Sequence, residues 1–75
     1  MYLSQLKINE KGKILLILAE PNIAKRLNDI GIMEGEIIKV VRIAPLGCPM
    51  EIEINNFYVS LRKGIAEKIK VEKVD

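Results

Sequence analysis

Few side chains of this sequence could do chemistry. Its 75 residues include no histidine, and the one cysteine is Cys48. Histidine is the most common general base and the most common metal ligand, and a zinc or iron–sulfur site needs several Cys or His ligands. A lone thiol also needs an activating base to become a good nucleophile. We therefore expect Cys48 to be an ordinary loop residue, and we expect neither catalysis nor a bound cofactor.

Two pairs of carboxylates could contact a hard cation. Glu51 and Glu53 would share one face of a strand, and Glu34 and Glu36 flank a turn at Gly35. A calcium ion takes about six to eight converging oxygen ligands, whereas pairs of exposed carboxylates are usually only solvated. The sequence also has no glycine-rich loop of the Walker or Rossmann type. We expect no metal site and no phosphate site, and we classify the chain as a non-enzyme.

The charge pattern argues against a nucleic-acid partner. The chain has 12 Lys and Arg against 10 Asp and Glu, a formal net charge of +2, and its aromatic content is 4%. Nucleic-acid binders normally cluster their basic residues and often supply aromatic rings for base stacking. Here the two signs are interspersed, and the basic pairs Lys25-Arg26 and Arg62-Lys63 are typical of a solvated surface. We expect no binding of DNA or RNA.

Hydropathy argues against insertion into a membrane. The longest apolar run, Ile14 to Ala19, falls far short of the ~20 residues that span a bilayer. The N-terminal residues 1–5 lack the basic region and the long apolar core of a signal peptide. With a single cysteine, no disulfide can form within the chain. These features predict a cytoplasmic location.

The first part of the chain predicts a short turn followed by a strand. Leu3 and Leu6, spaced three residues apart, indicate a turn that packs inward. Gly12 then releases the chain into residues 13–19, an apolar run without alternation. Such a run is typical of a strand that is buried on both faces, or of a strand that changes face as it curves.

The segment Pro21–Ile30 predicts the one convincing helix. Its apolar residues recur with helical spacing and form a single stripe. The stripe consists of Ile23, Leu27 and Ile30. Pro21 suits the first helical position, where its missing N–H is not needed. Gly31 stands where a left-handed C-terminal cap would, and Ile32 could make the accompanying apolar contact.

The remaining sequence predicts strands joined by short turns. Residues 36–44 have strand composition but exceed the usual strand length, which indicates a bend or bulge. Apolar residues alternate with polar ones over 50–54, and Asn55-Asn56 suits a hairpin turn. The other expected segments are a loop over 45–49, a strand over 57–61, a single helical turn within 62–68 and a last strand from residue 69. The result is mostly β, a small partly open β-barrel of about five strands with one short α-helix between the first two strands.

Four segments, in order, resemble the FeoA family of bacterial ferrous iron transport accessory proteins. The most specific is residues 26–35, which are similar to that family's pattern R-L-x-x-[LM]-G-[LI]-x-x-G at the helix exit. The other segments are Leu3–Leu6 with Gly12, Ala44–Gly47 with Pro49, and Leu61–Lys63 with Ala66 and Ile69–Val71. The chain departs from the family at Cys48, where a polar residue such as Asp is usual, and at Gly64.

The resemblance implies an SH3-like barrel, with residues 1–75 as a single FeoA-type domain. It also implies a small cytosolic accessory protein of ferrous iron uptake, whose partner is FeoB, a membrane transporter with a GTPase domain. Residue patterns alone stop at a β-barrel interaction module. Two alternatives stay open: the SH3-like regulatory domain of a DtxR-type metal-dependent repressor, and a direct carrier of a transition metal. The ligand inventory argues against the carrier and predicts at most weak binding of Fe²⁺ or Zn²⁺.

The candidate partner-binding residues are Arg26, Pro45, Leu46, Met50 and Arg62. A loop with two prolines is stiff, so ordering it on a partner costs little entropy, and exposed apolar side chains can anchor an interface. Leu46 either anchors a partner or folds back to plug the open end of the barrel. Arg26 and Arg62 are the candidates for an arginine supplied to a GTPase, and the alternative is that both pair with surface carboxylates. Weak self-association stays open.

Overall fold

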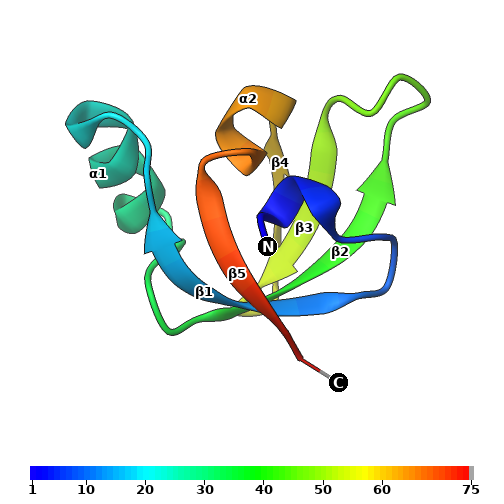
Figure 1. Cartoon of the computed structure of the whole chain (residues 1–75), viewed down its shortest axis with the longest axis horizontal. Helices are drawn as coiled ribbons and strands as arrows, with labels where there is room; N and C mark the ends of the chain where they lie inside the picture. Colours follow the sequence, from blue (N-terminus) through cyan, green and yellow to red (C-terminus); the bar gives the residue numbers. More distant parts are fainter. Residues whose placement is uncertain (75) are drawn as a thin grey trace.

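The computed structural model describes residues 1–74, in which five strands, two helices and a 3₁₀ turn are connected by short loops (Figure 1). In chain order they are η1 (Leu3–Gln5), β1 (Lys11–Ile17), α1 (Pro21–Asp29), β2 (Ile37–Ile43), β3 (Met50–Ile54), β4 (Phe57–Leu61), α2 (Lys63–Ala66) and β5 (Ile69–Val74). All strands join one antiparallel sheet in the order β4-β3-β2-β1-β5. The sheet curls into a barrel, and the barrel stays open because the edge strands β4 and β5 do not pair with each other. The predicted partly open barrel, with a helix between the first two strands, is confirmed.

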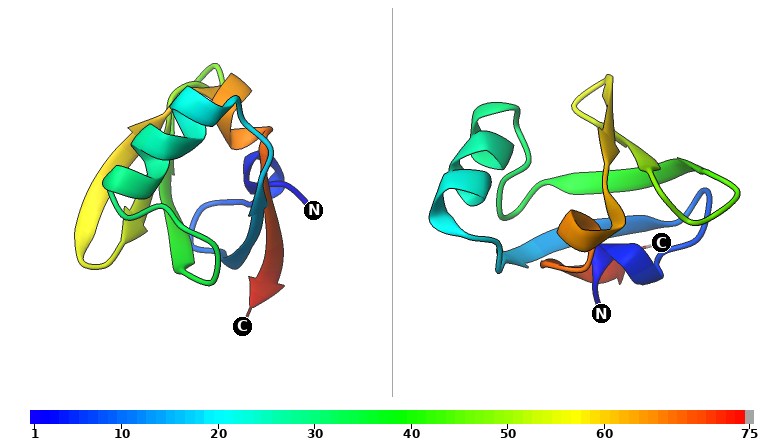
Figure 2. Two further views of the ribbon diagram at one scale, coloured as in Figure 1. Left: turned by 90° about the vertical axis from the view of Figure 1, so that its left-hand side faces the viewer. Right: turned by 90° about the horizontal axis from the view of Figure 1, so that it is seen from above.

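The curled sheet encloses one hydrophobic core (Figure 2, left). Every strand, both helices and η1 contribute to it, and no polar or charged side chain within residues 1–74 is buried. The largest fully buried side chains are Leu3, Leu6, Ile14, Ile32, Ile38, Val40, Ile52, Ile54, Ile69 and Val71. Apart from the two leucines these residues are β-branched, and β-branched side chains favour a half-buried pleated surface. In the same view α1 crosses the open side of the barrel, between the β3–β4 hairpin and β1.

Helix α1 ends at the capping glycine that the sequence predicts. Gly31 has a φ of 97°, which a residue with a side chain rarely adopts. Its N–H donates to the carbonyl of Asn28 at 3.0 Å, and the N–H of Ile32 donates to the carbonyl of Leu27 at 2.8 Å. These two bonds form a Schellman motif, and they bring buried Ile32 beside buried Leu27.

The apolar stripe of α1 is only partly buried. Leu27 belongs to the core and Ile23 packs partly against it. Ile30, the third member of the predicted stripe, is 44% exposed. It is the C-cap residue and lies beyond the last helical residue, so it does not continue the buried face. Ile30 therefore shares the helical spacing of the predicted stripe but not its burial.

Strand β1 changes face part-way along its length. Ile14 is buried, whereas Leu15 and Leu16 are both exposed and Ile17 turns partly inward again. The pairing with β5 shifts its register between Ile14 and Leu16, which marks a β-bulge. A strand buried on both faces was the wrong interpretation, and the alternative, a strand that changes face, is confirmed.

Gly12 lies inside β1 rather than before it. It pairs with Ile38 of β2 on one side and with Lys73 of β5 on the other. A Cβ at this position would lie 3.0 Å from Leu6 Cδ1 and 3.1 Å from Val71 Cβ. The glycine thus permits the close approach of Leu6, the residue after η1, and of β5 to the strand. The prediction that Gly12 precedes the strand is wrong, because β1 already begins at Lys11.

The second half of the sheet follows the sequence closely. The pairing of β2 with β3 shifts between Val40 and Arg42, which confirms the predicted irregularity within 36–44. Asn55 and Asn56 both have positive φ, 49° and 68°, and form the predicted two-residue hairpin turn.

Met50 is 4% exposed, because it begins the inward-facing row of β3. The prediction that Met50 binds a partner is therefore wrong.

Candidate partner-binding surface

Both helices and the loop between β2 and β3 lie at one end of the barrel (Figures 1 and 2). This end therefore carries four of the five residues that the sequence nominates for partner binding. The four are Arg26 of α1, Pro45 and Leu46 of the β2–β3 loop, and Arg62 at the N-cap of α2. Met50, the fifth, is part of the core.

Arg26 and Arg62 lie on the same groove, although they are far apart in the sequence. The groove runs between α1 and α2 and has a volume of about 710 Å³. Its lining, which is mostly apolar, consists of Ile23, Arg26, Leu27, Asp29, Ile30, Arg62 and Ile65. Within residues 1–74 neither arginine forms an ion pair, so the alternative in which both pair with surface carboxylates is wrong. Both guanidinium groups are exposed and available to a partner.

The β2–β3 loop is braced by its own backbone and by α2. The N–H of Gly47 donates to the carbonyl of Ala44 at 2.7 Å, and the N–H of Ala44 donates to the carbonyl of Pro49 at 3.1 Å. Lys63, the first residue of α2, donates its N–H to the Cys48 sulfur at 3.4 Å. The loop is therefore tied to the helix that carries one side of the groove.

Leu46 is 95% exposed at the tip of this loop. A side chain that plugged the barrel would be buried, so the plug interpretation is wrong. A leucine held in water on a short, hydrogen-bonded loop is the most exposed large apolar side chain that the structure describes. Its exposure is the geometry expected of an interface anchor.

The side chains with reactive or metal-binding groups do not converge. The thiol of Cys48 is exposed and accepts one backbone hydrogen bond. Residues 1–74 hold no group of three or more Cys, His, Asp or Glu side chains placed to bind a metal ion. Glu51 and Glu53 lie on the half-buried face of β3, opposite Ser60 and Tyr58 of β4. Within residues 1–74, no helix is long and apolar enough to span a membrane.

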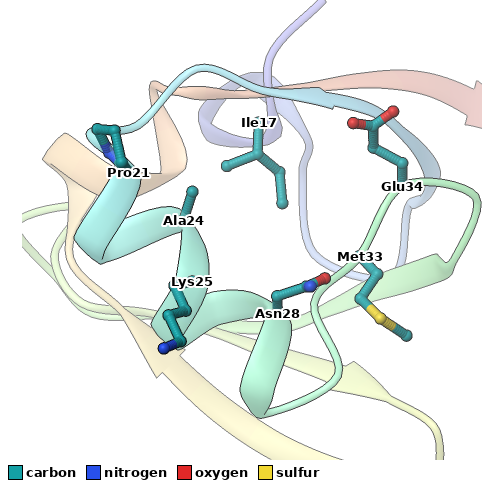
Figure 3. A pocket seen from close by; sticks show the side chains of 7 residues that line it. All are labelled: Ile17, Pro21, Ala24, Lys25, Asn28, Met33 and Glu34. Atoms are coloured by element: carbon teal, nitrogen blue, oxygen red, sulfur yellow. The ribbon is translucent and has the colours of Figure 1, made fainter.

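A second groove, which the sequence did not suggest, lies on the other side of α1 (Figure 3). It is lined by Ile17, Pro21, Ala24, Lys25, Asn28, Met33 and Glu34. Ile17 and Ala24 point into it, whereas the Lys25 side chain is directed away from Ile17. The neighbouring residues Lys25 and Arg26 thus lie on different grooves, on opposite sides of α1.

The curled five-stranded sheet, with its helix across the open side, defines a small SH3-like barrel. The FeoA domain family model matches residues 1–73. The chain is 37% identical to FeoA of Chlorobium tepidum, whose solution structure agrees with a TM-score of 0.95 over 100% of this chain and 71% of that one. Stenotrophomonas maltophilia FeoA complexed with zinc, described as a prokaryotic SH3 domain protein, is 26% identical with a TM-score of 0.76, over 96% of this chain and 89% of that one. The chain belongs to the FeoA domain family, which confirms the resemblance found in the sequence.

Two further comparisons bear on function. The chain is 36% identical over 72 residues to the Fe(2+) transport protein A/Fe(2+) transporter FeoB fusion protein of Porphyromonas gingivalis (strain ATCC BAA-308 / W83). The match covers 96% of this chain but spans only 8% of the length of that curated relative. A manganese-dependent transcriptional repressor in complex with manganese agrees with a TM-score of 0.90 over 99% of this chain and 36% of that one. At 20% identity, this likeness shows the fold alone.

Proposed function

We propose that this chain is a non-catalytic, cytoplasmic accessory protein of ferrous iron uptake that binds an FeoB-type transporter and supports or regulates it. The observation that carries the proposal is the fusion of a related FeoA region to the transporter in one polypeptide. Fusion holds two modules at a high effective concentration, which is useful when the separate modules must associate. Membership in the FeoA domain family and the name of the fused relative support a role in ferrous iron transport.

The proposed contact is made by Leu46, with Pro45 beside it. The loop is already ordered by its hydrogen bonds to Ala44 and to the start of α2, so binding loses little conformational entropy. Burying an exposed leucine side chain contributes roughly 1.5–3 kcal/mol. Leu46 therefore offers the most favourable single contact on this end of the barrel.

The test is binding of the FeoB GTPase domain to the Leu46→Asp variant. The variant should melt within about 4 °C of the parent protein, because substitutions at exposed sites away from structural features usually change stability by less than about 0.5 kcal/mol. Pull-down of the domain should be lost. Ile8→Asp is the matched control, since Ile8 is an exposed apolar residue in a turn outside this surface, and it should bind normally. A stable Leu46→Asp variant that binds like the parent would show that the loop is not the contact.

Arg26 and Arg62 favour an additional role in GTP hydrolysis, because both guanidinium groups are exposed and form no ion pair within residues 1–74. An arginine supplied to a GTPase stabilises the charge of phosphoryl transfer and accelerates hydrolysis by about 10³–10⁵. The turnover number of the FeoB GTPase domain, measured with and without this chain, tests the role. An unchanged turnover number excludes it, and loss of an acceleration in Arg26→Ala or Arg62→Ala identifies the residue.

A further inference from the structure

The edge of β4 presents unpaired backbone groups. A two-residue turn makes Ile54 and Phe57 the closing hydrogen-bonded pair of the β3–β4 hairpin, and alternate residues of an antiparallel strand bond to opposite sides. Phe57, Val59 and Leu61 therefore bond to β3. The N–H and C=O groups of Tyr58 and Ser60 point away from the sheet, where residues 1–74 provide no strand partner.

The two edges of the sheet differ in their protection. Along β5, the N–H of Val71 donates to the carbonyl of Met1 at 2.8 Å, and Tyr2 forms a bridge with Lys70. This strand also carries charged side chains, which discourage pairing with other chains. β4 has neither protection, since its sequence FYVSL contains no charge and no proline. Of the two edge strands, only β4 is therefore open to an added strand within residues 1–74.

The apolar groove between α1 and α2 includes residues next to both ends of β4. The C-terminal end of α1 is close to β4, because a Cβ placed on Gly31 would lie 3.4 Å from Phe57 Cζ. Figure 2 (left) shows α1 crossing from there over the open side of the barrel. The lining of this groove includes Ile30, which directly precedes Gly31, and Ile65 of α2.

The charge of the groove identifies the chemistry of its occupant. Arg26 and Arg62 contribute two positive charges, and Asp29 contributes one negative charge, so the groove is positive overall. Arg62 directly follows the open edge of β4, so a carboxylate at one end of an added strand would meet a guanidinium group. Arginine binds carboxylates through charge-assisted, often bidentate hydrogen bonds.

We infer that β4 and the α1–α2 groove bind an extended segment of a partner protein by strand addition. The segment pairs with Tyr58 and Ser60 through its backbone, places alternate apolar side chains in the groove, and directs an acidic side chain at Arg26 or Arg62. Strand addition of this kind takes its affinity from the backbone and its specificity from alternate side chains. This inference rests on the proposed function only where it identifies the partner as the transporter. The backbone pairing and the charge contact depend on this surface alone.

The probe is the synthetic peptide acetyl-Asp-Thr-Val-Thr-Val-Thr-amide, which places one aspartate and two valines on the same face of a strand. Its binding is followed by NMR of the isotope-labelled chain, with amide hydrogen exchange as the readout. Binding should slow the exchange of the Tyr58 and Ser60 amides by about tenfold or more at saturation. The same peptide with Asn in place of Asp should bind about three- to tenfold more weakly.

Paired variants separate the backbone contact from the charge contact. Ser60→Pro removes an outward-facing N–H without affecting the β3 ladder, and it should weaken binding about tenfold or more, whereas Ser60→Ala should not. Tyr58→Pro repeats the test if Ser60→Pro does not fold. Arg26→Ala should weaken binding about threefold or more, and Lys25→Ala, its neighbour on the other face of α1, should not.

The outcomes distinguish this inference from the proposed function. Absence of peptide-induced changes at 57–61, or equal binding by Ser60→Pro and Ser60→Ala, overturns the inference. Protection of the Tyr58 and Ser60 amides that rises with protein concentration alone also overturns it, because the edge then pairs with a second copy. Transporter binding that depends on Leu46 can survive these results. Peptide binding without any transporter binding would refute the proposed function and leave the surface assignment standing.

Discussion

Gly12 gives the sharpest test of the packing described here. Substitution by alanine places a Cβ 3.1 Å from Val71 Cβ and 3.2 Å from Val71 Cγ2, in addition to the 3.0 Å contact with Leu6 Cδ1. Leu6 and Val71 are both buried, so neither side chain can move into solvent. Val71 Cβ is attached to the β5 backbone, and relief requires β1 and β5 to separate. Overpacking of this kind costs about 1–3 kcal/mol.

The assay is unfolding by heat and by urea, with Gly64→Ala as the matched control. For a domain of this size, each kcal/mol corresponds to a change of about 4–8 °C in Tm, so Gly12→Ala should melt roughly 4–24 °C lower. No atom lies within 4 Å of a Cβ at Gly64, in the short helix α2, so alanine should leave stability unchanged there or raise it by up to about 1 kcal/mol. If Gly12→Ala and Gly64→Ala have the same Tm, the close approach of Leu6 and Val71 does not limit the residue at position 12.

Three other predictions concern stability. Gly31→Val should cost about 1–3 kcal/mol because its φ is positive, and an unchanged melt would contradict the cap assignment. Leu27→Ala should cost about 2–5 kcal/mol as a core truncation, and a near-neutral urea midpoint would contradict its burial. Hydrogen bonds from Lys73 and from the N–H of Lys7 lower the pKa of Glu10 below its ordinary value of 4.5. As pH falls, the unfolded chain therefore binds a proton at Glu10 before the folded chain does. The stability that the ionised Glu10 contributes is present above pH 4.5 and is lost as pH falls through the lowered pKa. Glu10→Gln should remove that part of the pH dependence of unfolding, and a variant with the same dependence of Tm on pH as the parent would contradict this.

Much of the fold follows from local features of the sequence. The end of α1 is specified by Gly31 and Ile32, because a positive φ and an apolar contact are needed there and nearby residues supply both. The β3–β4 hairpin is equally local, since Asn55 and Asn56 tolerate the backbone of a tight turn. Positions determined by their immediate neighbours are therefore predictable without knowledge of the remainder of the chain.

Positions determined by distant contacts were not predictable. The role of Gly12 depends on Leu6 and Val71, which approach it only in the folded barrel. The convergence of Arg26 and Arg62 on one groove likewise depends on how α1 crosses the barrel. Met50 is a different case, because its place in the alternation of 50–54 already indicated burial. That periodicity was a better guide than its position next to an exposed loop.

The pairing of β1 with β5 has a consequence for how the chain folds. Its registers join residues from opposite ends of the chain, Ile14 with Val71 and Ile17 with Ile69, whereas β2, β3 and β4 form a meander of neighbours. Long-range pairing of this kind closes a large loop and slows folding. During synthesis, β1 emerges early and must wait for β5, with the apolar side chains of Leu15 and Leu16 exposed beside its unpaired edge. The meander is therefore expected to order first on the ribosome, and the barrel is expected to form only when the last strand has been made.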